Sequence, residues 1–124
     1  MKYMMLIKHT ESYRLEDVPQ ALFDAMGKFV EESMRSGAIL DTGGLQSTSK
    51  GKRIRLAKGK ITVHDGPFTE AKEVVGGYAI GEFKSFEDAL KLATRFMDVH
   101  RTHWPQFEGE CELRPFELGP VPAK

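Results

Sequence analysis

The chain has 124 residues, of which 40% are hydrophobic and 29% charged, the balance of an ordinary globular protein with a single domain. Eighteen Lys and Arg residues match eighteen Asp and Glu residues, so the formal net charge is zero. This balance argues against a protein that binds nucleic acid by neutralising many phosphates. One local basic cluster remains, and it is typical of the charged edge of a hairpin: Lys50, Lys52, Arg53 and Arg55.

The cysteine content and the length of the apolar runs indicate the cellular compartment of the protein. Because Cys111 is the only cysteine, an intrachain disulfide is excluded and a reducing compartment is favoured. No apolar run is long enough to cross a bilayer, and the N-terminal stretch has no small-residue cleavage site. We therefore predict a cytoplasmic protein that binds neither membrane nor nucleic acid.

The N-terminal part of the chain reads as a strand followed by a helix. Residues 2–9 are apolar on both alternating faces, which indicates a strand covered on both sides. Residues 17–36 carry apolar side chains at three- and four-residue spacing, as an amphipathic helix does. Asp17 is the expected N-cap of this helix, and Gly37 is the expected residue just beyond its end.

The middle of the chain reads as strands. Residues 38–46 form one strand, and a short turn with a glycine joins residues 52–57 and 60–64 as a hairpin. Residues 74–83 form a further strand whose glycines indicate a bulge, or the close approach of another backbone or a ligand.

The C-terminal part reads as a helix and a last strand. Ser85 is the expected start of the helix, which ends before Pro105. Residues 111–118 form the strand, and its proline favours a position at the edge of the sheet. Residues 119–124 are expected to be a flexible tail.

This element order predicts an α+β, ferredoxin-like antiparallel sheet with two helices on one face. Two helices cover only one face of such a sheet, yet the first strand is apolar on both faces. A homodimer in which two sheets pack face to face would cover the second face.

The least ordinary stretch is VHDGPFTEAKEVVGGY, residues 63–78. Strand alternation places Asp65 on the same face as Ile61 and Val63. A carboxylate against apolar surface has a raised pKa unless it is paired, and such a group can serve as a general acid or base. Asp-Gly and Gly-Pro are also turn dipeptides, in which the Asp side chain bonds nearby backbone. Both interpretations of Asp65 stay open at this point.

The same stretch resembles the signature of the DGPF group within the YCII-related family. The opening MKYMMLI and the ending ECELRPFE also resemble that family, so the likeness spans about residues 1–118. The resemblance implies a ferredoxin-like domain that dimerises as an α/β barrel, in a small cytoplasmic bacterial protein. Some relatives are encoded beside extracytoplasmic-function sigma factors, which implies a link to a regulatory or stress pathway.

The resemblance also implies a catalytic His–Asp pair in a cleft. Here His9 with Asp65 is the best match, because His64 is too close to Asp65 in sequence. Three further residues are candidates for binding a ligand: Lys72, Tyr78 and Arg114. Each has a plainer interpretation, as a solvated loop charge, a packed sheet aromatic and an edge-strand charge that could also pair with Asp65.

The remaining histidines and the thiol point to no metal site and no cofactor. His100 and His103 are three residues apart, but no other ligands join them in a recognisable pattern, and histidines near a helix C-terminus interact favourably with its dipole. Cys111 is expected to be a structural thiol. Two functions follow: a small-molecule site in a dimer-associated cleft with acid/base chemistry, or a non-enzymatic regulatory or interaction module. The sequence leaves open whether the protein is an enzyme.

Overall fold

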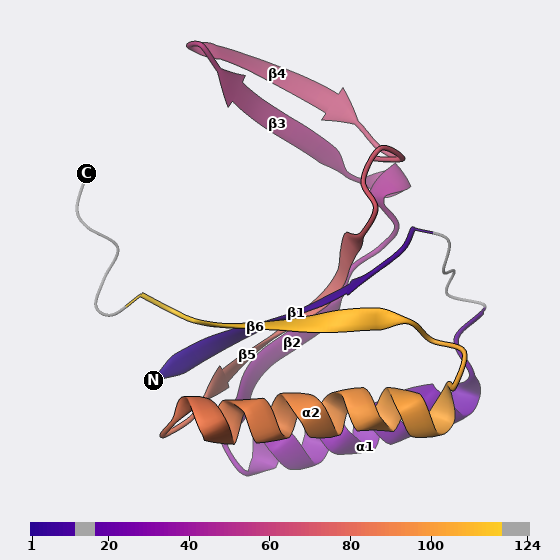
Figure 1. Cartoon of the computed structure of the whole chain (residues 1–124), viewed down its shortest axis with the longest axis vertical. Coiled ribbons are helices and arrows are strands. Elements are labelled where there is room, and N and C mark those ends of the chain that lie inside the picture. Colours follow the sequence, from indigo (N-terminus) through magenta and orange to yellow (C-terminus); the bar gives the residue numbers. More distant parts are fainter. Residues whose placement is uncertain (12–16, 118–124) are drawn as a thin grey trace.

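The computed structural model describes residues 1–11 and 17–117. Its main body is a four-stranded antiparallel sheet with both helices on one face, and a separate two-stranded hairpin projects from this body (Figure 1). The elements of the body are β1 (Lys2–His9), α1 (Gln20–Arg35), β2 (Ile39–Gly44), β5 (Val74–Glu82), α2 (Phe86–His103) and β6 (Gly109–Pro115). A short 3-10 turn, η2 (Thr48–Lys50), leads into the hairpin strands β3 (Lys52–Ala57) and β4 (Lys60–Asp65).

The strand order in the sheet is β2-β5-β1-β6. β1 lies in the centre and pairs antiparallel with both β5 and β6. The predicted α+β, ferredoxin-like architecture is confirmed, with the hairpin inserted between β2 and β5. β6 is an edge strand, as the proline at its end predicted.

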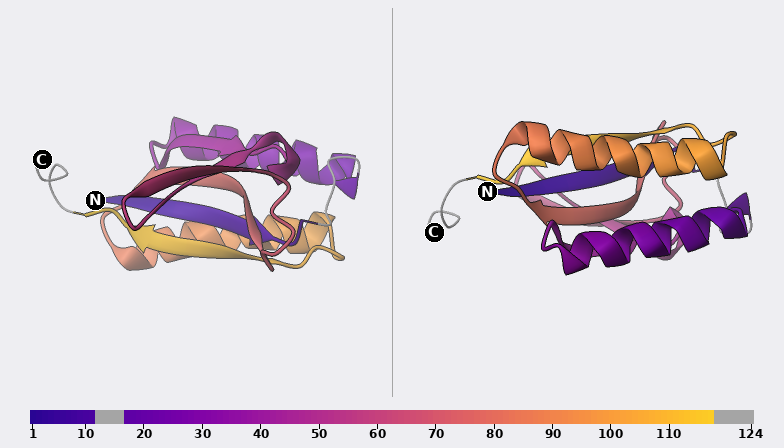
Figure 2. Two further views of the ribbon diagram at one scale, coloured as in Figure 1. Left: turned by 90° about the horizontal axis from the view of Figure 1, so that it is seen from above. Right: turned by 90° about the horizontal axis from the view of Figure 1, so that it is seen from below.

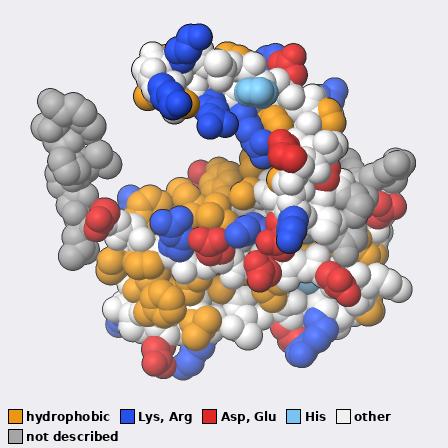
Figure 3. Space-filling view, turned by 45° about the horizontal axis from the view of Figure 1, so that its top comes forward, with side chains coloured by type: hydrophobic (Ala, Val, Ile, Leu, Met, Phe, Trp, Pro, Cys, Tyr) orange, Lys and Arg blue, Asp and Glu red, His pale blue; other side chains and the backbone are white. Residues whose placement is uncertain are grey.

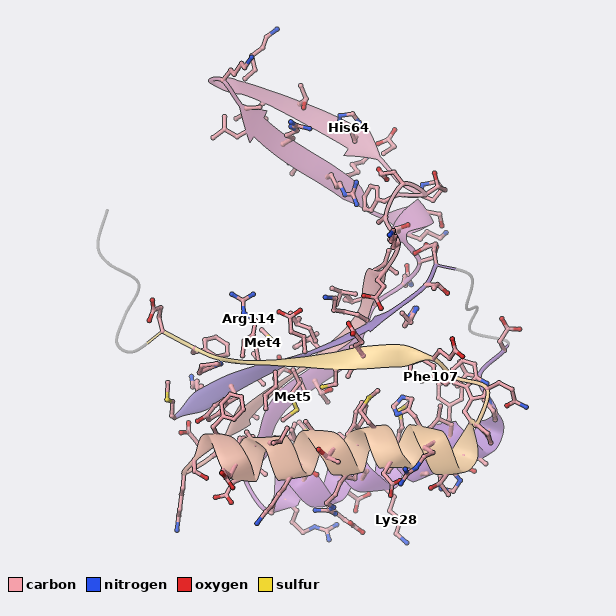
Figure 4. All side chains as sticks on the ribbon, in the orientation of Figure 1. Met4, Met5, Lys28, His64, Phe107 and Arg114 are labelled. Carbon is pink, nitrogen blue, oxygen red and sulfur yellow. The ribbon has the colours of Figure 1, made fainter. Side chains whose placement is uncertain are left out.

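The two faces of β1 have different surroundings. Tyr3 and Met5 point toward the helices and are buried in the core, whereas Met4 and Leu6 point to the other face and are half-buried. Figure 4 shows Met5 below the sheet, on the helix side, and Met4 above it. The face that carries Met4 is called here the open face, because neither helix covers it (Figure 2).

The core lies between the sheet and the two helices. Its members are apolar side chains from both helices and from the inner face of the sheet: Tyr3, Met5, Phe29, Ile39, Phe83, Ala89, Leu92 and Ala93. α2 begins where expected, since the Ser85 hydroxyl accepts a hydrogen bond from the Asp88 amide at 3.1 Å. Gly37 follows α1 with a φ of 85°, the left-handed conformation that a C′ glycine adopts most easily.

The start of α1 differs from the prediction. Asp17 is not the N-cap; Pro19 holds that position with an extended backbone and no side-chain cap. The Pro19 carbonyl accepts hydrogen bonds from the Leu22 and Phe23 amides, so the helix begins at Gln20, three residues later than predicted. A proline ring fixes φ near the helical value without needing a backbone donor, which suits the first turn of a helix.

The hairpin forms its own sheet over the open face of the body (Figure 2). Cross-strand pairing puts Ile54 opposite Val63 and Leu56 opposite Ile61, with all four side chains on one side of the ribbon. We call this side the apolar face of the hairpin. Positive φ angles at Lys58 and Gly59 close the turn, in the manner of a two-residue hairpin loop.

Candidate functional site

The DGPF turn joins the hairpin to the body through tight backbone contacts. A Cβ atom on Gly66 would lie 1.7 Å from the carbonyl oxygen of Thr48, so only glycine fits there. The Gly66 amide donates to the Gly51 carbonyl at 3.0 Å, and the Phe68 amide donates to Thr48 Oγ1 at 3.1 Å. The peptide between Gly66 and Pro67 is cis. We call residues 47–51 and 66–70 the hairpin root.

A carboxylate at the end of β1 completes the root. Glu11 Oε1 accepts hydrogen bonds from Ser47 Oγ, from the Thr48 amide and from Thr48 Oγ1, at 2.9, 3.0 and 2.8 Å. Burial acts to raise the pKa of Glu11, but the bonds from Thr48 and Ser47 outweigh it and hold the pKa below its usual value. Glu11 is therefore a structural anchor between the body and the root.

The rest of the motif fixes the direction of β3. The Arg53 guanidinium lies 4.0 Å from the centre of the Phe68 ring, and Arg53 Nη1 donates to Glu70 Oε2 at 2.9 Å. A guanidinium over an aromatic face adds a cation–π attraction to the ion pair. Most of the DGPFTE stretch thus has a structural role, which is to hold the hairpin at a set angle to the body.

Asp65 lies at the end of β4, on the same side of the hairpin as Ile61 and Val63, as strand alternation predicted. Its carboxylate forms an ion pair with Lys52 on the opposite strand. The Asp65 side chain is 76% exposed, because the hairpin leaves the body and nothing in the described chain covers it. The structure gives Asp65 a partner in the hairpin.

His9 lies in a different environment. Its Nδ1 lies 2.7 Å from the Thr10 carbonyl oxygen, and its ring meets the edge of Phe107 with a centroid separation of 6.3 Å. A Cβ on Gly76 would lie 2.0 Å from His9 Nε2, so a larger residue at this point of β5 would require the His9 ring to move. His9 packs toward Phe107, which follows α2, whereas Asp65 pairs with Lys52. The two members of the predicted pair therefore have different neighbours.

The predicted ligand-binding residues Tyr78 and Arg114 both lie on the open face. Tyr78 is paired with Leu6 across β5 and β1, and Arg114 is paired with Met4 across β6 and β1. Figure 4 shows Arg114 above the sheet beside Met4. The third candidate, Lys72, is exposed in the connection between β4 and β5. Side chains 36 residues apart thus reach one surface because of strand register.

A hydrogen-bonded pair on the open face was missed by the sequence analysis. Tyr78 Oη donates to Asp41 Oδ2 at 2.9 Å. This bond to the carboxylate, together with burial, raises the pKa of Tyr78, so the phenol keeps its proton at neutral pH. The sequence did contain a signal for this pair. Asp41 is a carboxylate within a strand, and the two glycines that follow in β2 leave space for the side chain of a neighbouring strand.

A second polar cluster lies nearer β6 on the same face. Lys8 Nζ donates to Glu112 Oε1 at 3.0 Å, which raises the pKa of Lys8 and lowers the pKa of Glu112. Arg114 Nη1 lies 3.8 Å from the other oxygen of Glu112 and its side chain is 69% exposed. Arg114 is thus only loosely held by Glu112.

The open face and the hairpin enclose a hollow. Figure 3 shows hydrophobic side chains on its floor and Lys and Arg side chains along the hairpin beside it. The apolar residues on this side of the sheet include Met4, Leu6 and Ile80, which the pairing of β1 with β5 brings together. An apolar floor with a few polar groups around it is the usual composition of a small-molecule site.

A separate groove lies between α2 and β6, with a volume of about 450 Å³. Its lining is apolar along α2 and includes the half-buried Cys111 and two carboxylates on β6: Leu90, Ala93, Thr94, Met97, Gly109, Glu110, Cys111, Glu112 and Leu113. Burial raises the pKa of the Cys111 thiol, so it is not activated as a nucleophile. Among the described residues, no Lys or Arg side chain lines this groove, and neither Tyr78 nor Asp41 reaches it.

Of the two histidines at the end of α2, His100 is bonded within its own helix. His100 is buried, and its Nδ1 lies 3.0 Å from the Phe96 carbonyl oxygen, so this nitrogen carries the proton. Burial lowers the pKa of His100 and outweighs the opposing effect of that hydrogen bond. Within residues 1–11 and 17–117, no three His, Cys, Asp or Glu side chains are grouped so as to hold a metal ion.

The comparison with protein families bears out the likeness seen in the sequence. The model of the YCII-related domain matches residues 1–100. The chain belongs to the YCII-related family. Among curated proteins, none matches the chain significantly. Within the described ranges, no helix is long and apolar enough to span a membrane.

Proposed function

We propose that this YCII-related chain binds a small organic molecule against the open face of its sheet, in a cleft completed by a second copy of the chain. The observation that carries the proposal is the set of polar groups placed around apolar side chains on this sheet surface. The Tyr78–Asp41 pair lies near β2, and Arg114 lies on β6, with Met4, Leu6 and Ile80 in the rows of side chains between them.

The chemistry of these groups favours an amphiphilic anion as the ligand. Arg114 offers a planar fork of donors to a carboxylate and is only weakly engaged by Glu112. Met4 and Leu6 offer an apolar surface to the body of the ligand. The Asp41 carboxylate accepts from Tyr78 and retains capacity to accept from a hydroxyl group of the ligand.

Acid/base chemistry would use the Tyr78–Asp41 pair in this proposal. The raised pKa of Tyr78 keeps its proton in place, so Tyr78 acts as a donor that orients Asp41, and Asp41 is the group able to accept a proton. The His9–Asp65 pair stays a prediction from the family resemblance. Lys72 remains a candidate for the rim of the cleft.

The test is a thermal-shift titration of the full chain with benzoate, 4-hydroxybenzoate, hexanoate and neutral benzyl alcohol. A ligand that binds only the folded state raises the melting temperature in a saturable way. We expect a shift with the carboxylates, largest with 4-hydroxybenzoate, and none with benzyl alcohol. Arg114→Gln should abolish the shift, and Tyr78→Phe should reduce the advantage of 4-hydroxybenzoate over benzoate.

The matched control is Arg101→Gln, which removes another exposed arginine, on α2, paired with Asp98. It should bind like the original chain. If none of the three carboxylates shifts the melting temperature, or if Arg114→Gln binds as well as Arg101→Gln, the proposed site is wrong.

The second candidate function is an interaction module without chemistry. The projecting hairpin with its exposed apolar face favours this candidate. A link to a sigma-factor pathway, a cytoplasmic location and membership of the DGPF group stay predictions from the sequence. A pull-down from a bacterial lysate, with a chain lacking the exposed apolar residues as control, separates this candidate from the ligand site.

A further inference from the structure

We propose that the outer edge of β6 and the groove beside it bind an extended peptide by antiparallel strand addition, with aliphatic side chains in the groove and basic side chains beside Glu110 and Glu112. The inference goes beyond the proposed ligand site, because the groove lies between β6 and α2 and neither Tyr78 nor Asp41 lines it. The bound peptide would extend the main sheet by one strand next to β6.

The backbone of β6 is paired on one side only, since the strand order β2-β5-β1-β6 leaves it at the end of the sheet. The Phe116 amide donates to the Lys2 carbonyl at 2.9 Å, so in this register the even-numbered residues of β6 bond to β1. The odd-numbered residues turn their N–H and C=O groups to the outer edge: Gly109, Cys111 and Leu113. No strand of the described chain pairs with this edge, and such a row of backbone groups is a template for another strand.

The groove lies where side chains of an added strand would enter it. Directly opposed residues of an antiparallel pair have their side chains on the same face of the sheet. Cys111 and Leu113 pack against the core on the helix side, so residues opposite them would point into the groove of about 450 Å³ beside α2 (Figure 1). The α2 wall of the groove is apolar, and its Leu90 is 51% exposed. Strand addition of this kind takes its specificity from pockets for alternate side chains.

The charges beside the edge favour a basic peptide. Its alternate residues would lie on the other face of the sheet, next to the exposed Glu110 and to Glu112, which is half-buried and bonded to Lys8. Glu112 raises the pKa of this lysine, and the weaker effects of Glu73 and Glu110 act in the same direction. Arg114 is the other cation beside Glu112. Three carboxylates therefore face two cations here, and opposite charges on neighbouring strands attract.

The first test titrates the full ¹⁵N-labelled chain with an acetylated and amidated pentapeptide of sequence valine-lysine-valine-lysine-valine. We expect hydrogen exchange of the Cys111 and Leu113 amides to slow about tenfold or more, because these amides gain an acceptor. The Glu110 and Glu112 amides are already bonded to β1 and should change less. A peptide with glutamate in place of lysine should bind about threefold more weakly or worse.

The second test uses N-methylated peptides to separate strand addition from adhesion through side chains. In the antiparallel arrangement the valine amides donate to β6, whereas the lysine amides point away from it. Methylating the amide of the middle valine should raise the Kd about tenfold or more, and methylating one lysine amide should change it less than about twofold. Equal binding of the two methylated peptides would reject strand addition.

The third test changes the groove. Leu90→Ala removes part of its apolar wall, and we expect the Kd to rise about fivefold. The matched control is Leu45→Ala, since Leu45 is 53% exposed and lies outside the groove. Glu110→Gln should reduce the preference for the lysine peptide over the glutamate peptide. Glu31→Gln, which removes an exposed carboxylate on α1, should keep it.

Two further outcomes would overturn the proposal. One is equal binding by Leu90→Ala and Leu45→Ala. The other is slow exchange of the Cys111 and Leu113 amides before any peptide is added, because the edge would then be occupied by another part of the chain or by a second copy. A chain that fails to bind the lysine peptide but still responds to 4-hydroxybenzoate would reject the strand-addition site and leave the ligand site standing.

Discussion

The helix side of the sheet and the β3–β4 hairpin are built from the same pattern, apolar side chains alternating along strands, and they differ in what covers those side chains. Along β1, Tyr3 and Met5 are buried under α1 and α2. Along the hairpin, Ile54 and Leu56 remain exposed to solvent. Alternating apolar residues therefore indicate side chains that favour burial. The position of the strand in the fold determines whether the rest of the same chain buries them.

The difference also separates two uses of tight packing. In the core, side chains pack against side chains, and the aromatic pair Tyr3–Phe83 is an example at 5.9 Å between ring centres. At the hairpin root, backbone packs against backbone at Gly66, and polar bonds from Glu11 hold the junction. The packing of side chains in the core stabilises the body, and the contacts at the hairpin root set the direction in which the hairpin leaves the body.

The largest expected effect contrasts one buried and one exposed apolar residue. Leu22 is 1% exposed, so Leu22→Ala should lower the free energy of unfolding by about 2–5 kcal/mol through lost burial and a cavity. Ile54→Thr should change it by no more than about 0.5 kcal/mol in the monomer, as is usual for exposed sites. Urea denaturation at several protein concentrations measures both.

Protein concentration sharpens the contrast. If the β3–β4 hairpin contributes to the contact with a second copy, the effect of Ile54→Thr should grow as the dimer forms, while the effect of Leu22→Ala should stay the same. An effect of Ile54→Thr as large as that of Leu22→Ala in dilute monomer would mean that the hairpin belongs to the core of its own chain.

The next effect concerns the root. Gly66→Ala places a methyl group against the Thr48 carbonyl, and because backbone atoms cannot move aside easily, we expect a loss of about 1–3 kcal/mol. Backbone amide signals of residues 47–51 should shift in an NMR spectrum. Gly44→Ala is the control, since a Cβ there meets nothing within 4 Å and should cost little. Equal losses in both variants would show that the root is not tightly packed.

A smaller effect should be a pH dependence of the free energy of unfolding that comes from the buried His100. The pKa of His100 is lowered by burial from an ordinary value near 6.5, so the unfolded chain takes up its proton first as the pH falls. Stability should therefore be full above about pH 6.5 and decline as the pH falls below it. His100→Gln, which can still donate to the Phe96 carbonyl, should remove this part of the decline, and His103→Gln should retain it. Denaturant midpoints between pH 7.5 and 5 would measure it, and identical profiles for the two variants would contradict the prediction.

The sequence predicted most of the body because its signals are local. Alternation predicted the strands, Ser85 the start of α2, and Gly37 the end of α1. Asp17 was wrong as an N-cap because Pro19 itself defines the start of the helix. The fold class followed from the order of the elements along the chain and the rule that two helices cover one face.

The candidate site was less predictable, because it depends on register between distant strands. Tyr78 and Arg114 were each identified separately, but only the pairing of β5 and β6 with β1 shows that they share the open face. Asp41 was missed, since its partner Tyr78 lies in a non-adjacent segment. Asp65 was placed correctly beside Val63, but alternation could not show that this face of the hairpin is exposed.

The smallest expected effect tests the two interpretations of Asp65. Its ion pair with Lys52 is exposed on both sides, so Asp65→Asn should lower the free energy of unfolding by no more than about 0.5 kcal/mol. The turn itself is held by Gly66, Thr48 and Phe68, which the substitution leaves intact. Asp65→Asn should therefore keep the dimer Kd and the response to 4-hydroxybenzoate. If stability is kept but the carboxylate response is lost, Asp65 belongs to the ligand site and the catalytic prediction regains support. If the hairpin loosens instead, the Lys52 pair stabilises the hairpin more strongly than its exposure indicates.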